Sequence, residues 1–330
     1  MSAPGFRKLV ITGVPFIVWL TLVIAGTARP SAAQTQKNYV VITVSTKDLS
    51  SAPVWLADRL GYFKKEGLEP RIVVMRSDLQ IASLISGDAD FAGSLSSVTK
   101  AAAVGIPVKI VVSFFNGGFF YLVTKPDITD IKMMRKKTIA ISRYGSATDF
   151  DARAVLKHFS LEAGRDVTIL PVGGGTNRLT SLVSGRVDGA ILTEGEKEHA
   201  EKAGMKALLS TGQFNKQPVG GLGTSIEKIR TNRDFLVKSL RAVYRALTVL
   251  KNDKNAIKDF FDKELAISAK QFDSAYESML KVFLPEGEIP ASDLVAPYED
   301  ARKAATKPPP VGLDDLVDWS LLRVARASAK

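Results

Sequence analysis

The residues of this sequence that could bind a ligand are hydroxyl-bearing and small residues placed directly after short apolar runs. In the N-terminal half they are Ser45, Thr46, Ser50, Ser51, Ser94, Ser96 and Ser97. In the middle of the chain they are Ser142, Gly145, Ser146, Ala147, Thr148, Gly174, Thr176 and Thr193. Several backbone amides and hydroxyls at helix N-termini can bind an anion without any basic side chain. For a single Ser or Thr, capping of its own helix is the simpler role, so the predicted anion site depends on the convergence of many such groups.

An aromatic residue and an acidic residue lie among these groups. Tyr144 stands beside the Gly145-Ser146 turn, and we predict that its ring forms one wall of the site. Other aromatic residues available as walls are Trp55, Phe114, Phe115, Phe119 and Phe120. Glu194 follows a predicted strand, residues 188–192, and its carboxylate could pair with the ammonium group of a zwitterion. The alternative role for Glu194 is the first turn of the following helix, where an acid stabilises the helix dipole.

The sequence lacks the patterns that catalysis or metal binding would need. It contains no Cys and only two His residues, His158 and His199, which fall on predicted helices without metal-ligand spacing. A Gly-x-Ser-x-Gly nucleophile motif does not occur. The run from Gly173 to Thr176 lacks the Gly-Lys-Ser/Thr ending of a phosphate-binding loop. We therefore expect no catalytic residue, no metal and no cofactor.

Two successive units of the sequence alternate β-branched runs with helical patterns. In the first unit the predicted strands are 39–45, 71–75, 91–94 and 108–114, and the predicted helices are 52–65, 79–86 and 97–104. In the second unit the predicted strands are 137–142, 167–172 and 188–192, and the predicted helices are 146–163 and 178–184. This alternation is typical of α/β proteins with parallel strands and helical crossovers. Ligands of such sheets bind beyond the carboxyl ends of the strands, where the candidate residues lie.

The two units also resemble each other in amino-acid sequence. The segment from Ser83 to Ala92 reads SLISGDADFA, and the segment from Ser181 to Ala190 reads SLVSGRVDGA. In each copy the Gly suits a left-handed helix end. We interpret Asp90 and Asp188 as turn residues before a strand that enters the sheet, not as catalytic acids. The duplication predicts two similar lobes that enclose one cleft.

Beyond Gly220 the pattern becomes mainly helical. The predicted helices are 231–251, 254–263 and 268–283, and a last amphipathic segment is 313–324. Pro308-Pro309-Pro310 breaks the chain before this last segment. We expect the tail to dock on a lobe and to contact no ligand.

The N-terminus has the order of a secretory signal. Arg7 and Lys8 precede an apolar run, residues 9–25, and the small residues Ser31-Ala32-Ala33 follow, which predicts cleavage after Ala33 and a periplasmic protein. The alternative, an uncleaved membrane anchor, fits less well because the run is short and contains Gly and Pro. Without Cys, the mature chain cannot carry a lipidated cysteine. The net charge of +11 falls to +8 when Arg7, Lys8 and Arg29 are removed. This dispersed charge favours small anions over nucleic acid as partners.

Several segments together resemble the substrate-binding proteins of nitrate, sulfonate and taurine ABC importers, a family that also includes binders of thiamine precursors. They are Gly61-Tyr62-Phe63-Lys64-Lys65-Glu66-Gly67-Leu68, Gly87-Asp88-Ala89-Asp90, Gly145-Ser146 and the second Gly-x-x-Asp turn. The resemblance implies a type II periplasmic binding fold, with two α/β lobes, two crossover segments as a hinge and the ligand in the cleft. It implies a signal peptide over 1–33, a first lobe over 34–123 and 218–330, and a second lobe over 124–217.

The resemblance also implies the function that we expect. The chain would be a monomer that captures a small organic anion, such as a sulfonate, taurine or a carboxylate, for the membrane subunits of an ABC importer. A thiamine-pyrimidine-precursor binder, or an enzyme of the same fold, is the alternative. A regulatory effector domain would carry a helix-turn-helix at the N-terminus, where the export signal lies. A receptor for a membrane sensor is not distinguished from an importer component by the sequence.

Overall fold

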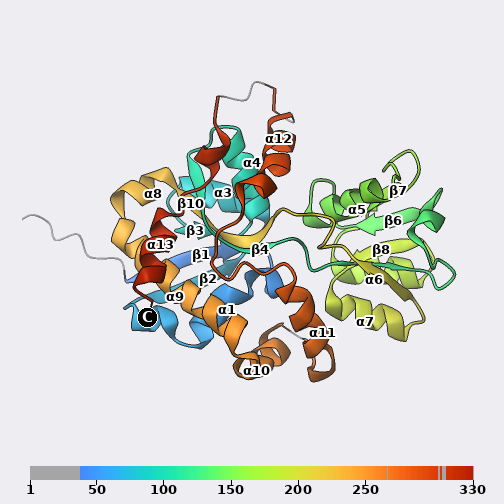
Figure 1. The fold of residues 1–330 in the computed structure, drawn as a ribbon, viewed down its shortest axis with the longest axis horizontal. Helices are drawn as coiled ribbons and strands as arrows, with labels where there is room; N and C mark the ends of the chain where they lie inside the picture. Colours follow the sequence, from blue (N-terminus) through green and yellow to red (C-terminus); the bar gives the residue numbers. More distant parts are fainter. Residues whose placement is uncertain (1–37, 266, 304, 307–309, 330) are drawn as a thin grey trace, which may run out of the picture. The chain divides into compact units, whose positions relative to one another are not determined.

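The computed structural model describes residues 38–265, 267–303, 305–306 and 310–329. The predicted signal peptide and part of the predicted proline break lie outside the described residues. The described chain forms two five-stranded sheets, each with helices on both faces (Figure 1). We call the sheet that begins with the first strand, together with its helices, the first lobe, and the other sheet with its helices the second lobe. The predicted α/β class is confirmed.

The first sheet has the strand order β2-β1-β3-β10-β4. Its strands are β1 (Tyr39–Val44), β2 (Glu69–Val74), β3 (Phe91–Ala92), β4 (Val108–Asn116) and β10 (Pro218–Ser225). The helices between its first strands are α1 (Ala52–Arg59), α2 (Tyr62–Lys65), α3 (Ser77–Ile85) and α4 (Leu95–Ala103), and a short 3-10 turn, η1 (Leu49–Ser51), precedes α1. β1 pairs in parallel with β2 and β3, but β10 runs antiparallel between β3 and β4.

The second sheet repeats this arrangement with the order β7-β6-β8-β5-β9. Its strands are β5 (Tyr121–Thr124), β6 (Thr138–Ile141), β7 (Thr168–Pro171), β8 (Gly189–Leu192) and β9 (Lys206–Ser210). Its helices are α5 (Ala147–His158), α6 (Gly175–Val183) and α7 (Glu194–Lys202), with a 3-10 turn, η2 (Ile131–Met134), after β5. β5 is antiparallel to β8 and β9. The predicted parallel strands with helical crossovers are found, and each sheet also contains one inserted antiparallel strand that the alternation does not indicate.

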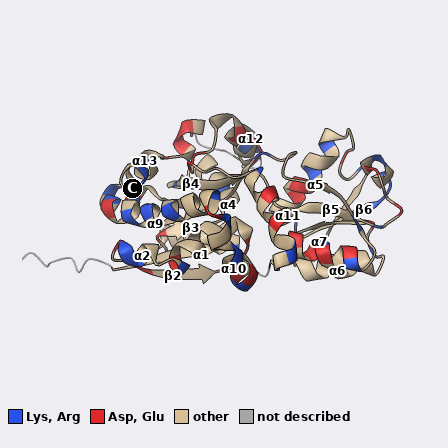
Figure 2. Cartoon of the chain, turned by 60° about the horizontal axis from the view of Figure 1, so that its bottom comes forward, with Lys and Arg blue, Asp and Glu red and all other residues tan. Residues whose placement is uncertain are grey.

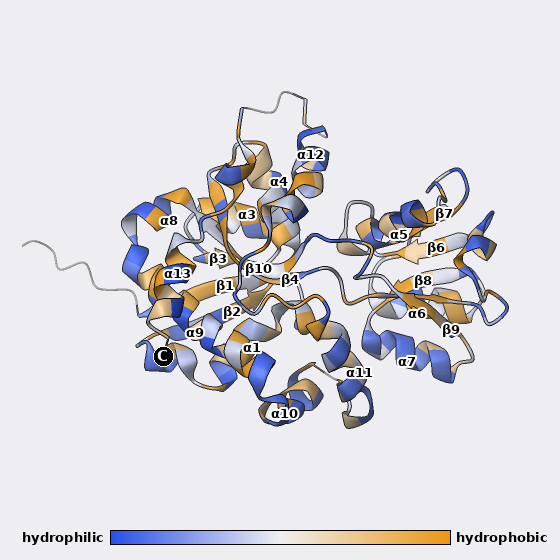
Figure 3. Ribbon diagram, viewed as in Figure 1, coloured by the Kyte–Doolittle hydropathy of each residue, from blue (hydrophilic) through white to orange (hydrophobic). Residues whose placement is uncertain are grey.

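Alternate residues of the central strands fill separate cores on the two faces of each sheet. Ile139 and Ile141 of β6 pack with α5, whereas Ala140 packs on the opposite face near α6 and α7. In β1, Val40 and Ile42 pack in the core that contains α1. Strands therefore read as continuous apolar runs because both of their faces are covered. Figure 3 shows this in the apolar colouring of the strands and the mixed colouring of the helices around them.

The remaining helices belong to the first lobe. They are α8 (Ile226–Thr231), α9 (Arg233–Asn252), α10 (Lys254–Leu265), α11 (Ala269–Leu280), α12 (Val295–Lys303) and α13 (Ser320–Ala327), with 3-10 turns η3 (Ala291–Leu294) and η4 (Leu313–Leu316). α9 packs its apolar face on α1, α2 and α13. The segment after α11 follows the free edge of β4, where Leu284 N donates to Phe114 O over 2.8 Å and Ser113 N donates to Gly287 O over 2.8 Å. This segment covers a sheet edge. The predicted tail, residues 313–324, docks on the same lobe, because α13 packs on α9 and Asp318 N donates to Ile110 O over 2.8 Å.

Two chain segments cross between the lobes, residues 117–120 and 211–217. They hydrogen-bond to each other, because Thr211 N donates to Phe120 O over 2.9 Å. A Cβ at Gly118 would overlap the carboxylate of Asp151, and one at Gly212 would overlap Gly118 O. The crossings are therefore packed too closely for side chains at these two positions. Because β5 pairs within the second sheet, the first crossing precedes the boundary that we predicted after residue 123.

Two predicted helices end earlier than their apolar patterns suggest. The helix predicted over 146–163 stops at His158, because Ser160 takes a left-handed conformation with φ of 57° and Leu161 N donates to Leu156 O over 2.8 Å. Glycine usually occupies such a position, so the sequence contains no signal for this end. The helix predicted over 52–65 is divided by Gly61, whose φ is 67°.

The repeated turns have the structural role that we predicted. Gly87 and Gly185 both have a positive φ, 85° and 76°. Asp90 accepts a hydrogen bond from Val41 N of β1 over 2.8 Å and pairs with Lys228 over 2.6 Å. In the second lobe, Asp188 accepts from Thr138 N of β6 over 3.0 Å and pairs with Lys125 over 2.8 Å. Each Asp thus fixes its turn to the neighbouring strand.

Candidate functional site

The candidate residues after β1 are held by a carboxylate of the chain itself. Asp48 accepts hydrogen bonds from Ser50 N over 2.9 Å, from Ser50 Oγ over 2.6 Å and from Thr46 Oγ1 over 2.6 Å. Ser51 Oγ donates to Thr46 O over 2.7 Å. The amino end of this helical segment therefore already holds an anionic group, which is the arrangement expected of a cap.

A second group of candidates joins the ends of β1 and β3 through Gln80. This side chain is 0% exposed. Its Nε2 donates to Ser45 Oγ over 3.1 Å, and its Oε1 accepts from Ser94 N over 2.9 Å. Ser94 Oγ lies 3.1 Å from Ser97 Oγ and 3.4 Å from Ser96 Oγ. The amino end of α4 therefore holds three neighbouring hydroxyls. The sequence analysis missed Gln80 because nothing in the pattern of α3 distinguishes a buried polar residue there.

Three hydroxyls form a triangle at the amino end of α5. Ser142 Oγ lies 2.8 Å from Ser146 Oγ and 2.9 Å from Thr148 Oγ1, and the Ser146 and Thr148 hydroxyls are 2.9 Å apart. Ser146 is the N-cap, as predicted, and Ala147 is the first residue of the helix. Gly145 takes a φ of 73° and donates its N–H to Asp149 Oδ2 over 2.8 Å. The triangle brings together the predicted residues that precede and begin α5.

The aromatic candidates separate into core residues and one exposed ring. Phe114 and Phe115 are fully buried, and Phe119 packs edge-on against Phe115 at 4.5 Å between centroids. Trp55 donates its Nε1–H to Ser51 Oγ over 3.2 Å. Tyr144 is 59% exposed, and its hydroxyl donates to Ile169 O over 3.0 Å. Tyr144, two residues before Ser146 of the hydroxyl triangle, is thus largely exposed while its hydroxyl is held by β7.

The amino end of α6, which contains Gly174 and Thr176, lies against Glu196. A Cβ at Gly175 would overlap the Glu196 carboxylate. Glu196 Oε2 also accepts from Thr193 N over 2.9 Å and lies 3.6 Å from Arg178 Nη2. Arg178 is 4% exposed and donates to Ile191 O and Gly173 O, both over 2.7 Å. Like the segment after β1, this helix end is supplied with an internal carboxylate.

Glu194 lies in the first turn of α7 and is 5% exposed. Its Oε1 is 2.8 Å from Lys197 Nζ, while its Oε2 is buried and has no hydrogen-bond partner among the residues that the structure describes. Burial, followed by the proximity of Glu194, raises the pKa of Tyr121. The Tyr121 hydroxyl lies 2.7 Å from Ser278 Oγ of α11. The structure supports a structural ion pair for one oxygen and leaves the ligand contact of the other a prediction.

Two cationic residues that the sequence analysis did not select lie beside the hydroxyl triangle. Lys100 of α4 donates through Nζ to Gly145 O over 3.1 Å. Arg143, just before the triangle, donates through Nη2 to Ser77 Oγ of α3 over 2.6 Å. Partial burial and the charge of Arg143 lower the pKa of Lys100, and Asp149 opposes this. Both hydrogen bonds join the first lobe to the second, and they place the last turn of α4 and the first residue of α3 beside the amino end of α5.

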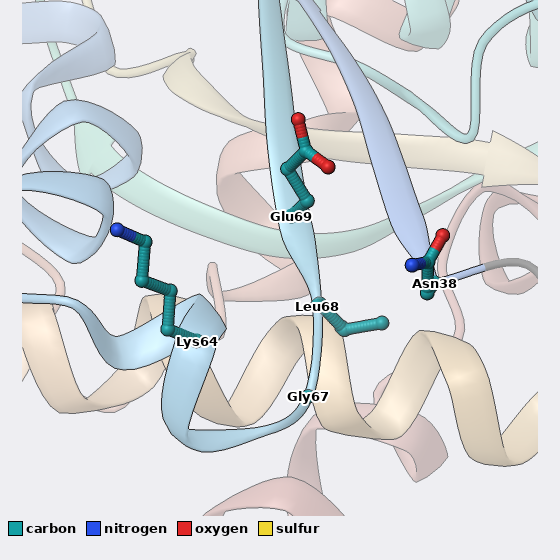
Figure 4. Close-up of a pocket in the computed structure, with 5 residues that line it drawn as sticks. All are labelled: Asn38, Lys64, Gly67, Leu68 and Glu69. Atoms are coloured by element: carbon teal, nitrogen blue, oxygen red, sulfur yellow. The ribbon is translucent and has the colours of Figure 1, made fainter.

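A surface depression lies at the other edge of the first sheet. It measures about 480 Å³ and is lined by Asn38, Lys64, Gly67, Leu68 and Glu69. Figure 4 shows these residues where β1 and β2 begin. This is the edge opposite to the carboxyl ends of the strands, where ligands of open parallel sheets bind. We therefore do not assign the ligand to this depression.

Two searches of the described residues were negative. No three His, Asp or Glu side chains in that part of the chain are grouped so that they could hold a metal ion. Among the described helices, none has the length and apolar composition needed to cross a bilayer.

Comparison with known proteins identifies relatives of binding proteins. The model of the NMT1/THI5-like family matches residues 48–257. The Bacillus subtilis (strain 168) protein YtlA, named as a binding protein, is 24% identical over 236 residues, which is 68% of this chain and 71% of YtlA.

Three solved structures illustrate the fold. The sulfonate-binding protein SsuA from Methylobacillus flagellatus KT has a TM-score of 0.67 and 20% identity, covering 88% of this chain and 94% of SsuA. The nitrate-binding protein NrtA from Synechocystis PCC 6803 has a TM-score of 0.67 and 15% identity, covering 89% of both chains. A DSZB mutant in complex with biphenyl-2-sulfinic acid has a TM-score of 0.65 and 14% identity, covering 88% of this chain and 99% of that one. The predicted periplasmic binding fold is confirmed.

Proposed function

Because the chain belongs to the NMT1/THI5-like family, we propose that it is an exported solute-binding protein that captures a small organic anion and delivers it to an ABC importer. The observation that carries this proposal is the hydroxyl triangle at the amino end of α5 in the second lobe, beside a lysine of the first lobe. Ser142, Ser146 and Thr148 form the triangle, and Lys100 Nζ of α4 lies 3.1 Å from Gly145 O, just before α5.

The chemistry of the amino end of α5 suits an anion. Backbone N–H groups and the helix dipole stabilise negative charge at a helix amino end, by about 0.3 to 1 kcal/mol when exposed and about 2 kcal/mol when partly buried. Micromolar affinity corresponds to about 8 kcal/mol. Hydroxyl donors to a charged group, at roughly 1.5 to 3 kcal/mol each, and the exposed ring of Tyr144 would supply the remainder.

The two crossings support a hinged capture mechanism. A ligand that contacts both lobes stabilises the arrangement in which the lobes enclose it. The importer subunits would then recognise the liganded form, and we expect one ligand for each monomeric chain. The ligand would be a zwitterion if its ammonium group donated a hydrogen bond to the buried Oε2 of Glu194.

A ligand screen on the purified mature protein tests the proposal. We expect taurine, alkanesulfonates, nitrate or aliphatic and aromatic carboxylates to raise the melting temperature, because a ligand at 100 times its dissociation constant adds about 2.7 kcal/mol to the unfolding free energy. Isothermal titration calorimetry should give one site per chain, and small-angle scattering should show a smaller radius of gyration with the ligand. If no anion binds under conditions where the protein is folded, the proposal is wrong.

The alternative is a binder of thiamine-pyrimidine precursors, or an enzyme of the same fold. The family name and the fold shared with DSZB keep this alternative open. If aminopyrimidines raise the melting temperature and none of the anions does, the result would favour a binder of thiamine-pyrimidine precursors. Formation of a new product from a bound compound, detected by mass spectrometry, would favour an enzyme of the same fold.

A further inference from the structure

We propose that Lys100 and Arg143 bind the anionic group of the ligand, and that Lys100 makes binding depend on the ligand's negative charge. This inference rests on the proposed function and specifies its site. It assigns to two side chains a selectivity that backbone amides and hydroxyls do not provide alone, since hydroxyls bind neutral and charged ligands alike.

The position of Lys100 is defined by contacts from both lobes. Its backbone belongs to α4, and its ammonium nitrogen lies 3.1 Å from Gly145 O and 4.9 Å from the centre of the Phe150 ring of α5. A Cβ at Gly145 would lie 3.6 Å from the same nitrogen. The ammonium group therefore rests on the turn that begins α5, directly beside the Ser146 triangle.

The positive charge in this neighbourhood is not neutralised by the nearby acids. Within the described part of the chain, neither Lys100 nor Arg143 forms an ion pair with a carboxylate, and each donates to a neutral oxygen. Asp149 is engaged by Arg153 Nε at 2.8 Å and by Gly145 N, while Asp78 is paired with Arg76 at 2.8 Å. Lys100 and Arg143 repel each other, which Asp149 only partly offsets, and a bound anion would reduce that repulsion.

The other helix ends provide the contrast. The segment after β1 contains the carboxylate of Asp48, and the amino end of α6 contains that of Glu196. The amino end of α5 also contains a carboxylate, that of Asp149, but here three hydroxyls and the cations Lys100 and Arg143 lie beside it. A Lys ammonium has three donor hydrogens, so Lys100 can keep its bond to Gly145 while it donates to a carboxylate or sulfonate oxygen. Lys100 would thus make the affinity depend on the ligand's charge and would also join the two lobes.

The test compares Lys100→Met with Lys157→Met, a matched control that removes the same charge from an exposed position of α5. The probes are the anion with the largest effect in the screen and its neutral counterpart, for example benzoate with benzamide or an alkanesulfonate with its sulfonamide. In Lys100→Met, the dissociation constant of the anion should rise about tenfold or more, as expected for a lost charge-assisted hydrogen bond. Its dependence on NaCl concentration should also weaken. Lys157→Met should stay within about twofold of the parent.

Arg143→Gln is the second variant, because Arg143 is exposed and its loss leaves the α4 contact intact. Arg143→Gln should also raise the dissociation constant of the anion. Lys100→Arg should restore part of the affinity lost in Lys100→Met. Unchanged anion affinity in Lys100→Met would overturn the inference while the proposed function stands. Equal weakening of the neutral probe would also overturn it, because Lys100 would then only join the lobes. Absence of any anion binding by the parent would instead refute the proposed function.

Discussion

The carboxylate of Asp151, on α5, contacts both crossings between the lobes. It lies one turn after the hydroxyl triangle and is 0% exposed. It accepts hydrogen bonds from the Thr211 hydroxyl and from Asn215 Nδ2 in the second crossing, and it packs against Gly118 in the first. Burial raises its pKa to about 6, although the two donors act in the opposite direction.

This shift predicts a pH-dependent stability. Because the folded-state pKa of about 6 exceeds the ordinary value of 3.8, the folded protein binds the proton more tightly than the unfolded chain. The contribution of Asp151 to the unfolding free energy is thus complete below pH 3.8 and is lost as the pH rises through about 6. A shift of about two pKa units corresponds to about 3 kcal/mol. Urea unfolding of the parent and of Asp151→Asn, from about pH 4 to 7, should show this loss in the parent relative to the variant.

The exposed residue Asp127 supplies the control for this measurement. In Asp127→Asn the difference from the parent should stay constant over the same pH range. A pH-independent difference between the parent and Asp151→Asn would mean that the buried carboxylate does not take up a proton on folding.

At the scale of elements, the amino ends of the helices fall into two kinds. Those at η1 and α6 lie against the carboxylates of Asp48 and Glu196. The amino end of α5 combines the carboxylate of Asp149 with three hydroxyls and with the nearby cations Lys100 and Arg143. An internal carboxylate competes with an external anion for a helix end, and neighbouring cations favour the anion. We therefore expect ligand binding to concentrate at the amino end of α5.

Glu196→Gln tests this division. The substitution keeps the shape of the side chain but leaves the buried guanidinium of Arg178 without its carboxylate partner, which lies 3.6 Å away. We expect the unfolding free energy to fall by about 1 to 2 kcal/mol and the dissociation constant of the anionic ligand to stay unchanged. Glu201→Gln, at an exposed position of the same helix, is the control and should alter neither quantity. A marked change in affinity in Glu196→Gln would instead indicate that the ligand binds at the amino end of α6, near Gly174 and Thr176.

Most elements, but few side-chain partners, could be predicted from the sequence. Apolar runs and helical periodicity are local properties, so the predicted bounds of β1, β4 and α9 lie close to the observed ones. β5 and β9 were not predicted, because a short antiparallel insertion resembles any apolar run. Ser146 was predicted as a cap from its spacing. Lys100 was not selected because an exposed Lys on a helix has no local mark of its partner, which lies in the other lobe.

At the scale of the whole molecule, the net charge is positive without a concentrated basic face. Figure 2 shows Lys and Arg interspersed with Asp and Glu over the helices of both lobes. The full sequence has a net charge of +11, which becomes +8 after removal of the predicted signal peptide. Such a distribution attracts small anions at long range and is weak evidence for a nucleic-acid partner.

Export of the whole chain predicts a mature protein that begins at Gln34. Intact-mass measurement of protein from a periplasmic fraction should give the mass of residues 34–330, since the small residues Ser31-Ala32-Ala33 form the predicted cleavage site. Substitution of Ala33 by Lys should retard cleavage and leave a larger product. Recovery of the uncut parent in the membrane fraction would contradict the proposed export.

The placement of β10 determines the order in which the protein can fold. β3 and β4 are not neighbours, and β10, which separates them, ends at Ser225, after the entire second lobe has been synthesised. The second lobe is contiguous in the chain, from β5 to β9, and depends on no later strand for its sheet. The first sheet must remain incomplete until a distant segment arrives, and closing such a long loop is slow. The N-terminal half of a nascent chain therefore stays without its finished sheet during much of synthesis, which leaves apolar strand edges exposed to chaperones.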